Sequence, residues 1–69
     1  MRYKIGDYVW YGDNLFRITM EQGGNYFYAI EKAVGKYNYL HNVPMHKLIP
    51  CKKEVADVFI ASNTHVTNN

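Results

Sequence analysis

The segment from Lys4 to Ile18 constrains the fold most strongly, because it has the pattern of a β-hairpin. A Gly-Asp pair precedes residues 8–11, Tyr-Val-Trp-Tyr, which all favour strands. Residues 12–14, Gly-Asp-Asn, tolerate the dihedral angles of a tight turn. Residues 15–20 then alternate with the period of two that is typical of a half-buried strand. One face is predicted to hold Phe16, Ile18 and Met20, and the other Leu15, Arg17 and Thr19.

The following residues supply further short strands separated by turn residues. Residues 22–25 contain a Gly-Gly pair, which reaches positive φ at little cost and favours a hairpin connection. Residues 26–32 and 37–43 are predicted as the third and fourth strands. Pro44 ends the fourth strand because it cannot donate to a ladder, and it leaves room for one 3₁₀ turn and a short closing strand at 48–49.

The segment 54–61 fits either a short helix or a strand. It places apolar side chains on one helical face, yet it also carries strand-type residues. We expect a helix, since the charged residues 52–54 suit a helix start and an open barrel end needs a lid. Residues 62–69 are polar and lack a periodic pattern, so we expect a flexible, frayed tail there.

The expected fold class is mainly all-β. A chain of 69 residues is too short for two separate cores, so residues 1–61 are expected to form a single domain. Short strands tend to close into a barrel, because closure removes exposed edges. The sequence therefore predicts a small antiparallel barrel of four or five strands, with a short C-terminal helix or strand and a frayed tail.

This pattern resembles the SH3-like small β-barrels of bacterial and phage type, the broad group that includes Tudor and KOW-type modules. The resemblance rests on residues 5–9 (Ile-Gly-Asp-Tyr-Val), 15–18 (Leu-Phe-Arg-Ile), 28–30 (Tyr-Ala-Ile) and 43–50, where a turn precedes two hydrophobic residues and a proline. In the opening, Gly permits the bend into the strand and the Asp carboxylate can accept hydrogen bonds from nearby amides. The resemblance implies an SH3-like barrel and leaves its ligand open, since one such barrel serves many partners.

The sequence departs from the resembled modules in two places. KOW-type modules typically carry several basic residues in the first loop, whereas this loop holds only residues 12–14, Gly-Asp-Asn. A Tudor-type cage requires aromatic side chains that converge beside an acidic group, and the sequence alone does not bring such side chains together.

Cysteine usage and net charge limit the cellular compartment and the class of partner that we expect for this chain. Cys51 is the single cysteine, so no internal disulfide forms and the chain is not a disulfide-stapled secreted scaffold. No apolar run follows the basic N-terminus as in a signal peptide, and no stretch approaches the ~20 apolar residues of a membrane span. We therefore expect a cytoplasmic protein without a membrane partner. The formal net charge of +2 is mild for a dedicated nucleic-acid binder.

The candidate binding surface is aromatic. If the odd-numbered residues of 8–11 point into the core, Tyr8 and Trp10 point outward, and the same register exposes Phe27 and Arg17. Outward rings beside Arg or Lys suit stacking on a peptide or on bases, or holding a cation. Alternatively, the rings cover the second side of a thin sheet or pack under the C-terminal segment, and the position of Trp10 distinguishes the two. The candidate binding residues are Tyr8, Trp10, Arg17, Phe27, Tyr37 and Tyr39.

The sequence contains no pattern of residues that indicates catalysis or metal binding. His41, His46 and Cys51 are spaced five residues apart, which fits none of the paired patterns of zinc sites. Paired carboxylates, a phosphate loop and a glycine loop suited to an oxyanion are also missing. We expect no enzyme activity, no metal, no cofactor and no small-molecule substrate.

Two functions remain open. The first is a non-enzymatic protein-interaction module, such as an accessory or regulatory protein of a phage or mobile element, with a protein partner or a second copy as its ligand. A homodimer is consistent with exposed strand edges, which pair readily. The alternative is a nucleic-acid-binding barrel that stacks bases on its aromatic rings. Its phosphate contacts would come from Lys32, Lys36, Lys52 and Lys53.

Overall fold

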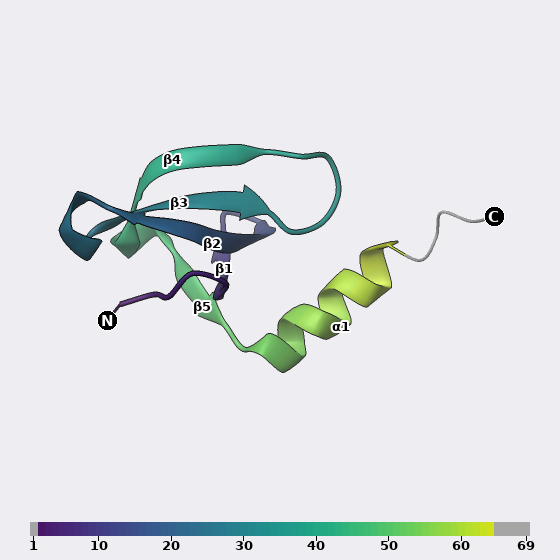
Figure 1. The fold of residues 1–69 in the computed structure, drawn as a ribbon. Helices are drawn as coiled ribbons and strands as arrows, with labels where there is room; N and C mark the ends of the chain where they lie inside the picture. Colours follow the sequence, from purple (N-terminus) through teal and green to yellow (C-terminus); the bar gives the residue numbers. More distant parts are fainter. Residues whose placement is uncertain (1, 65–69) are drawn as a thin grey trace.

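The computed structural model describes residues 2–64 and shows a five-stranded antiparallel sheet followed by one helix (Figure 1). The predicted fold class, mainly β with a short C-terminal helix, is confirmed. The strands are β1 (Tyr8–Tyr11), β2 (Asn14–Gln22), β3 (Phe27–Lys32), β4 (Tyr39–Pro44) and β5 (Ile49–Cys51). Two 3₁₀ turns, η1 (Gly23–Asn25) and η2 (Met45–Lys47), and the helix α1 (Lys53–Thr64) complete the described chain.

The strands lie in the order β4-β3-β2-β1-β5. The first four strands form a meander, and the chain then returns through η2 so that β5 pairs with β1 on its other side. Within the described residues β4 and β5 are the two ends of the sheet, so hydrogen bonding does not close it into a full barrel. Pro50 is tolerated in β5 because this strand has a neighbour on one side only.

The Gly-Asp pair before β1 forms a turn that fastens the N-terminus to the sheet. The Asp7 amide donates to the Lys4 carbonyl oxygen at 2.9 Å, and Gly6 has a φ of 98°, as the third residue of a type II turn requires. The Asp7 carboxylate in turn accepts a hydrogen bond from the Lys4 amide at 2.8 Å. The roles expected from the sequence for this glycine and this carboxylate are confirmed.

One hydrophobic core lies on the side of the sheet toward which Val9 and Phe16 point. Tyr3 completes it from outside the strands, because its ring packs edge-on against Tyr28 at a centroid distance of 5.4 Å. The Tyr3 hydroxyl donates to the Leu48 carbonyl oxygen at 3.3 Å, and the Tyr28 hydroxyl accepts from the Tyr3 amide at 3.0 Å. Both buried phenols are therefore satisfied. The core cluster contains Tyr3, Val9, Phe16, Ile18, Tyr28, Ile30, Val43 and Leu48.

The predicted alternation in β2 is correct up to Ile18 and wrong at Met20. The register between β2 and β3 shifts between Ile18 and Met20, so an extra residue interrupts the alternation of faces. Met20 is consequently 48% exposed instead of lying in the core. Leu15, expected on the solvent side, is fully buried at 1% exposure; it stands opposite Trp10, against which Phe59 of the C-terminal helix packs.

The helix α1 leaves the end of β5 and extends away from the sheet (Figure 1). It decides the alternative left open for residues 54–61 in favour of a helix. It ends at Thr64, so residues 62–64, assigned to the tail from the sequence, are helical. The rest of the expected tail, residues 65–69, lies outside the described residues. No helix among the described residues is long and apolar enough to cross a membrane.

Candidate interaction surface

Five residues, one from each strand, stand opposite one another across the sheet. Tyr8 lies opposite Arg17 on one side and Cys51 on the other. Arg17 lies opposite Glu31, which lies opposite Tyr39. Directly opposed residues of an antiparallel pair share a face, and this face is the one turned away from the core. We call Cys51, Tyr8, Arg17, Glu31 and Tyr39 the outer row.

An ion pair occupies the centre of the outer row. The Arg17 guanidinium donates through Nη2 to Oε2 of Glu31. Both side chains are partly exposed, so solvent screens the pair, and a pair of this kind contributes about 0.5 kcal/mol to folding. Its larger effect is on the surface, because the Glu31 carboxylate neutralises the cation that sequence reasoning had placed in the binding surface. The centre of the row is therefore nearly neutral.

Tyr39 is held in one orientation at the β4 end of the row. Its hydroxyl is hydrogen-bonded to Oγ1 of Thr19 at 3.1 Å. Thr19 is fixed in turn by a hydrogen bond to the Ala29 carbonyl oxygen at 3.1 Å. The ring of His41 meets the Tyr39 ring edge-on, with centroids 4.8 Å apart. The Tyr39 ring is thus pre-positioned and would lose little conformational freedom on binding.

Trp10 lies on the same face as the outer row, where the helix packs against it and leaves it half-buried. It stands opposite Leu15, and its ring packs edge-on against Phe59 of α1 with centroids 5.1 Å apart. Leu15 and Ala56 are fully buried, which makes this the place where α1 is fastened to the sheet. Trp10 packs against the C-terminal segment, as the second of the two readings expects, but it stays half-buried, so its position does not decide between the two readings for Tyr8 and Tyr39.

The two remaining aromatic candidates lie apart from the outer row. Phe27 opens β3, opposite Gln22 and Pro44, and borders a hollow of about 450 Å³. Tyr37 is in the loop between β3 and β4 and is 70% exposed. The structure therefore brings together Tyr8, Arg17 and Tyr39 of the predicted set, and leaves Phe27 and Tyr37 separate.

The four lysines predicted to contact phosphate come from two segments. Lys32 ends β3 and Lys36 lies in the loop that follows, whereas Lys52 and Lys53 stand at the start of α1. Lys53 is paired with Asp57, with Nζ 2.9 Å from Oδ2, and this carboxylate raises the pKa of the Lys53 ammonium. Lys53 lines a hollow together with Tyr8 and Cys51 of the outer row, but the four lysines form no single cluster.

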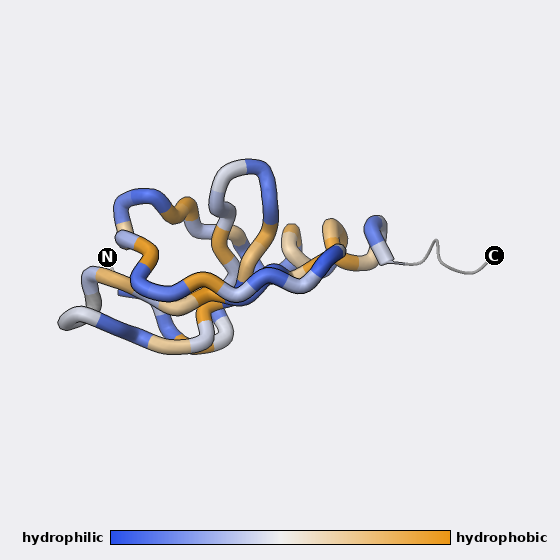
Figure 2. The backbone as a smooth tube through the Cα atoms, turned by 90° about the horizontal axis from the view of Figure 1, so that it is seen from above, coloured by the Kyte–Doolittle hydropathy of each residue, from blue (hydrophilic) through white to orange (hydrophobic). Residues whose placement is uncertain are grey.

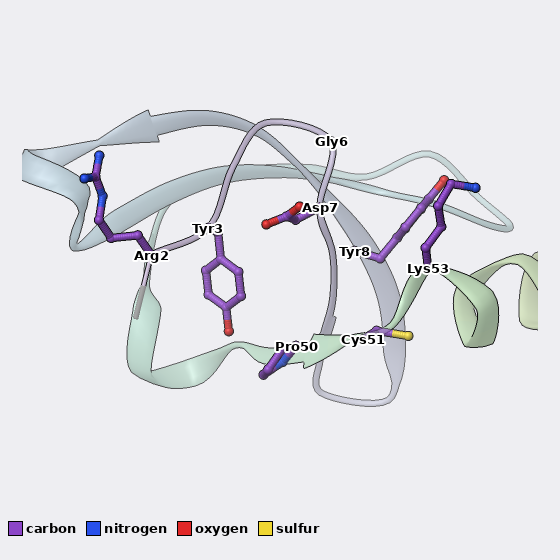
Figure 3. Close-up of a pocket in the computed structure, with 8 residues that line it drawn as sticks. All are labelled: Arg2, Tyr3, Gly6, Asp7, Tyr8, Pro50, Cys51 and Lys53. Atoms are coloured by element: carbon purple, nitrogen blue, oxygen red, sulfur yellow. The ribbon is translucent and has the colours of Figure 1, made fainter.

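A hollow of about 350 Å³ opens beside the Tyr8 end of the outer row (Figure 3). Figure 3 shows Arg2 and Lys53 at its opposite ends, with Asp7 between Tyr3 and Tyr8. Burial raises the pKa of the Cys51 thiol, and a hydrogen bond with Trp10 opposes part of that rise. Cys51 is therefore protonated near neutral pH and is a poor nucleophile. The hollow is lined by Arg2, Tyr3, Gly6, Asp7, Tyr8, Pro50, Cys51 and Lys53.

A second hollow, of about 600 Å³, lies between the β1–β2 turn and the β3–β4 loop. Tyr11 and Phe16 are the aromatic residues that line it, and Phe16 is a buried core residue. The lining residues include no carboxylate. An aromatic cage for a methylated cation requires converging rings and benefits from an acidic group, so this hollow does not have that composition.

Among residues 2–64, no three His, Cys, Asp or Glu side chains gather as a metal site would require. His41, His46 and Cys51 in particular are on β4, η2 and β5.

Sequence reasoning missed the partners that shape the outer row. Glu31 was not named as a site residue, and Thr19 was placed on the face with Arg17 but not in a site. The register supplies the missing signal, since β2 and β3 pair so that Arg17 meets an acidic residue directly opposite it.

The chain matches no family model, no curated protein and no solved structure in the comparisons made with each of them.

Proposed function

We propose that the chain is a non-enzymatic protein-interaction module on an SH3-like barrel, and that the outer row is its contact surface. The strand order supports the SH3-like assignment, because a four-strand meander is followed by η2 and by a fifth strand that returns to β1. The turn η2 and the first two residues of β5 fall within residues 43–50, the segment on which the resemblance rests.

The observation that carries the proposal is a row of partly exposed side chains across the sheet, in which Thr19 holds Tyr39 and Glu31 neutralises the central Arg17. Tyr8 and Tyr39 offer apolar rings with polar hydroxyls, the chemistry enriched in protein interfaces. Arg17 contributes a planar guanidinium already paired with Glu31, so the surface carries little net charge there. A neutral aromatic surface fits a protein partner better than a polyanion.

Removal of the central ion pair tests this proposal without changing the net charge. The variant with Arg17→Ala and Glu31→Ala should lose at least tenfold in capture of its partners from an extract of the cells that produce the chain. The matched control, Arg2→Ala with Glu21→Ala, removes another ion pair, of 3.8 Å, and should capture as the wild type does. Equal capture by all three proteins would contradict the assignment of the outer row.

A second candidate function has one observation in its favour. Tyr37 is 70% exposed and follows Lys36 in the β3–β4 loop, which is a suitable pair for a stacked base and its phosphate. Fluorescence anisotropy with labelled single-stranded oligonucleotides at low salt tests this function. Binding that weakens steeply with salt and is lost in Tyr37→Ser would replace the first proposal, whereas absence of binding at tens of micromolar would exclude the second.

A further inference from the structure

The second hollow, between the β1–β2 turn and the β3–β4 loop, has an apolar floor. Phe16 belongs to the hydrophobic core, and Tyr11 and Leu40 pack against that core while they stay half-buried. The Tyr11 ring meets the Phe16 ring edge-on, with centroids 5.8 Å apart. All three side chains line the hollow, so it opens onto apolar surface that the sheet leaves partly uncovered. We call Tyr11, Phe16 and Leu40 the apolar floor.

Polar side chains surround the apolar floor. Asn14 opens β2, Asn38 lies directly before β4 and Lys47 ends η2, and all three line the hollow. None of these side chains, nor the Tyr11 hydroxyl, makes a hydrogen bond or an ion pair with another residue in the described part of the chain. Figure 2 shows a similar division over the whole fold, because hydrophilic residues recur in the loops and hydrophobic ones along the strands. A ligand can therefore use these donors and acceptors without breaking a contact of the fold.

The charges at and around the hollow favour an anionic ligand. Lys47 is the charged residue among those that line it. Asp13 in the β1–β2 turn carries a carboxylate, but it does not line the hollow, and it is outnumbered by Lys32 at the end of β3 and Lys36 in the β3–β4 loop. Glu31, next to Lys32, is already paired in the outer row. This end of the sheet therefore has an excess of positive charge.

We infer that the second hollow binds the C-terminal residue of a partner protein, with its free carboxylate beside Lys47. A carboxylate and an ammonium form a charge-assisted hydrogen bond, which is stronger than a neutral one. The last peptide group has one donor and one acceptor, and the carboxamides of Asn14 and Asn38 supply the complement of each. An apolar last side chain covers the apolar floor and removes its surface from water. Each part of such a chain end thus has a counterpart in the hollow.

Other classes of ligand leave part of the hollow unused or are repelled by it. An internal peptide segment has no main-chain charge to pair with Lys47. A nucleic acid brings phosphates that require several cations, and its bases need an open ring face, whereas Phe16 is only 2% exposed. A methylated lysine is a cation, so Lys47 repels it. A terminal carboxylate next to an apolar side chain suits both the polar and the apolar lining of the hollow.

The inference goes beyond the proposed function and does not depend on it, because no residue of the outer row lines the second hollow. A single residue of a partner buries little surface, so this contact alone is weak. A partner that engages both the outer row and the second hollow would bind more tightly than either contact alone allows.

Titration of the isotope-labelled chain, followed by NMR, tests the class of ligand. The probe is the peptide acetyl-Gly-Gly-Leu with a free carboxylate, compared with the same peptide ending in an amide and with octanoate. The free peptide should shift the backbone amide signals of the lining residues. The amide and octanoate should bind at least about fivefold more weakly, because each lacks one of the matched groups. No shift up to about 10 mM free peptide would overturn the inference, as would equal binding of the amide or of octanoate.

A matched pair of substitutions tests the role of Lys47. Lys47→Met keeps an apolar stem and removes the charge, so it should raise the Kd of the free peptide about fivefold and leave that of the amide peptide unchanged. Lys52→Met removes the same charge directly before α1 and should change neither Kd. Equal effects of the two substitutions would show that only net charge matters and would overturn the inference. The variant with Arg17→Ala and Glu31→Ala should bind the free peptide as the wild type does, so a failure of the outer row is seen separately.

Discussion

At the residue scale, the glycines show how local geometry decides what a turn can contain. Gly12 and Gly23 both have positive φ, 61° and 53°, a region in which other residues are strained. Their surroundings differ, because a Cβ at Gly12 would meet nothing within 4 Å, whereas a Cβ at Gly23 would lie 2.6 Å from Cδ1 of Phe27. Both positions read as turns from the sequence, but only the folded chain shows that a ring packs against one of them.

This difference predicts unequal costs for one substitution at the two turns. Gly12→Ala should lower the free energy of unfolding by about 1 kcal/mol, the cost of a left-handed alanine. Gly23→Ala should cost that amount and about 1 kcal/mol more, because Phe27 must move. Urea denaturation of both variants measures the difference, and equal midpoints would mean that the Phe27 ring does not rest on the turn.

The ion pairing of a charged residue was harder to predict than the face of the sheet on which it lies. Tyr8 and Arg17 could be assigned to an outward face from the alternation of β1 and β2, and Tyr39 was a candidate for its aromatic ring. The neutralisation of Arg17 could not, since it depends on the pairing of β2 with β3 through a turn whose length fixes the register.

At the scale of elements, β1 and its turn could be read from the sequence because strand-favouring residues and turn residues alternate sharply there. The interruption after Ile18 could not, because a bulge depends on the pairing of two strands and leaves no pattern in either alone. The end of the helix at Thr64 was also missed. Ser62, Asn63 and Thr64 each donate a side-chain hydrogen bond to the carbonyl oxygen four residues earlier, which suits polar residues to a final helical turn.

The contact between Trp10 and Phe59 is expected to hold α1 on the sheet. Phe59→Ala should remove an aromatic pair that contributes about 1 kcal/mol beyond its burial, and it should expose Trp10 to solvent. We expect a red shift of tryptophan fluorescence and a loss of helical circular dichroism. Val58→Ala, on the exposed side of the same helix, serves as the control at low micromolar concentration. A spectrum of Phe59→Ala that stays unchanged would mean that the helix is fastened elsewhere.

At the scale of the whole molecule, the fold class followed from the spacing of turns, while the shape of the surface did not. A chain of 69 residues with four or five short strands has few ways to bury its apolar side chains, so one bent sheet is the expected solution. The division of the aromatic residues depends on where α1 lies, because Phe59 of the helix packs against Trp10 but against neither Tyr8 nor Tyr39 in the ring contacts of the described residues. Residue types alone do not contain that information.

The central claim is that the outer row meets a protein partner, and site-specific photo-crosslinking tests it most directly. A photoreactive phenylalanine analogue replaces Tyr8 in one protein and Tyr37, in the β3–β4 loop, in a control, and both are irradiated in the cells that produce the chain. The account predicts a discrete protein adduct from position 8 and none of the same mass from position 37. No adduct from position 8, or the same adduct from both positions, would contradict it.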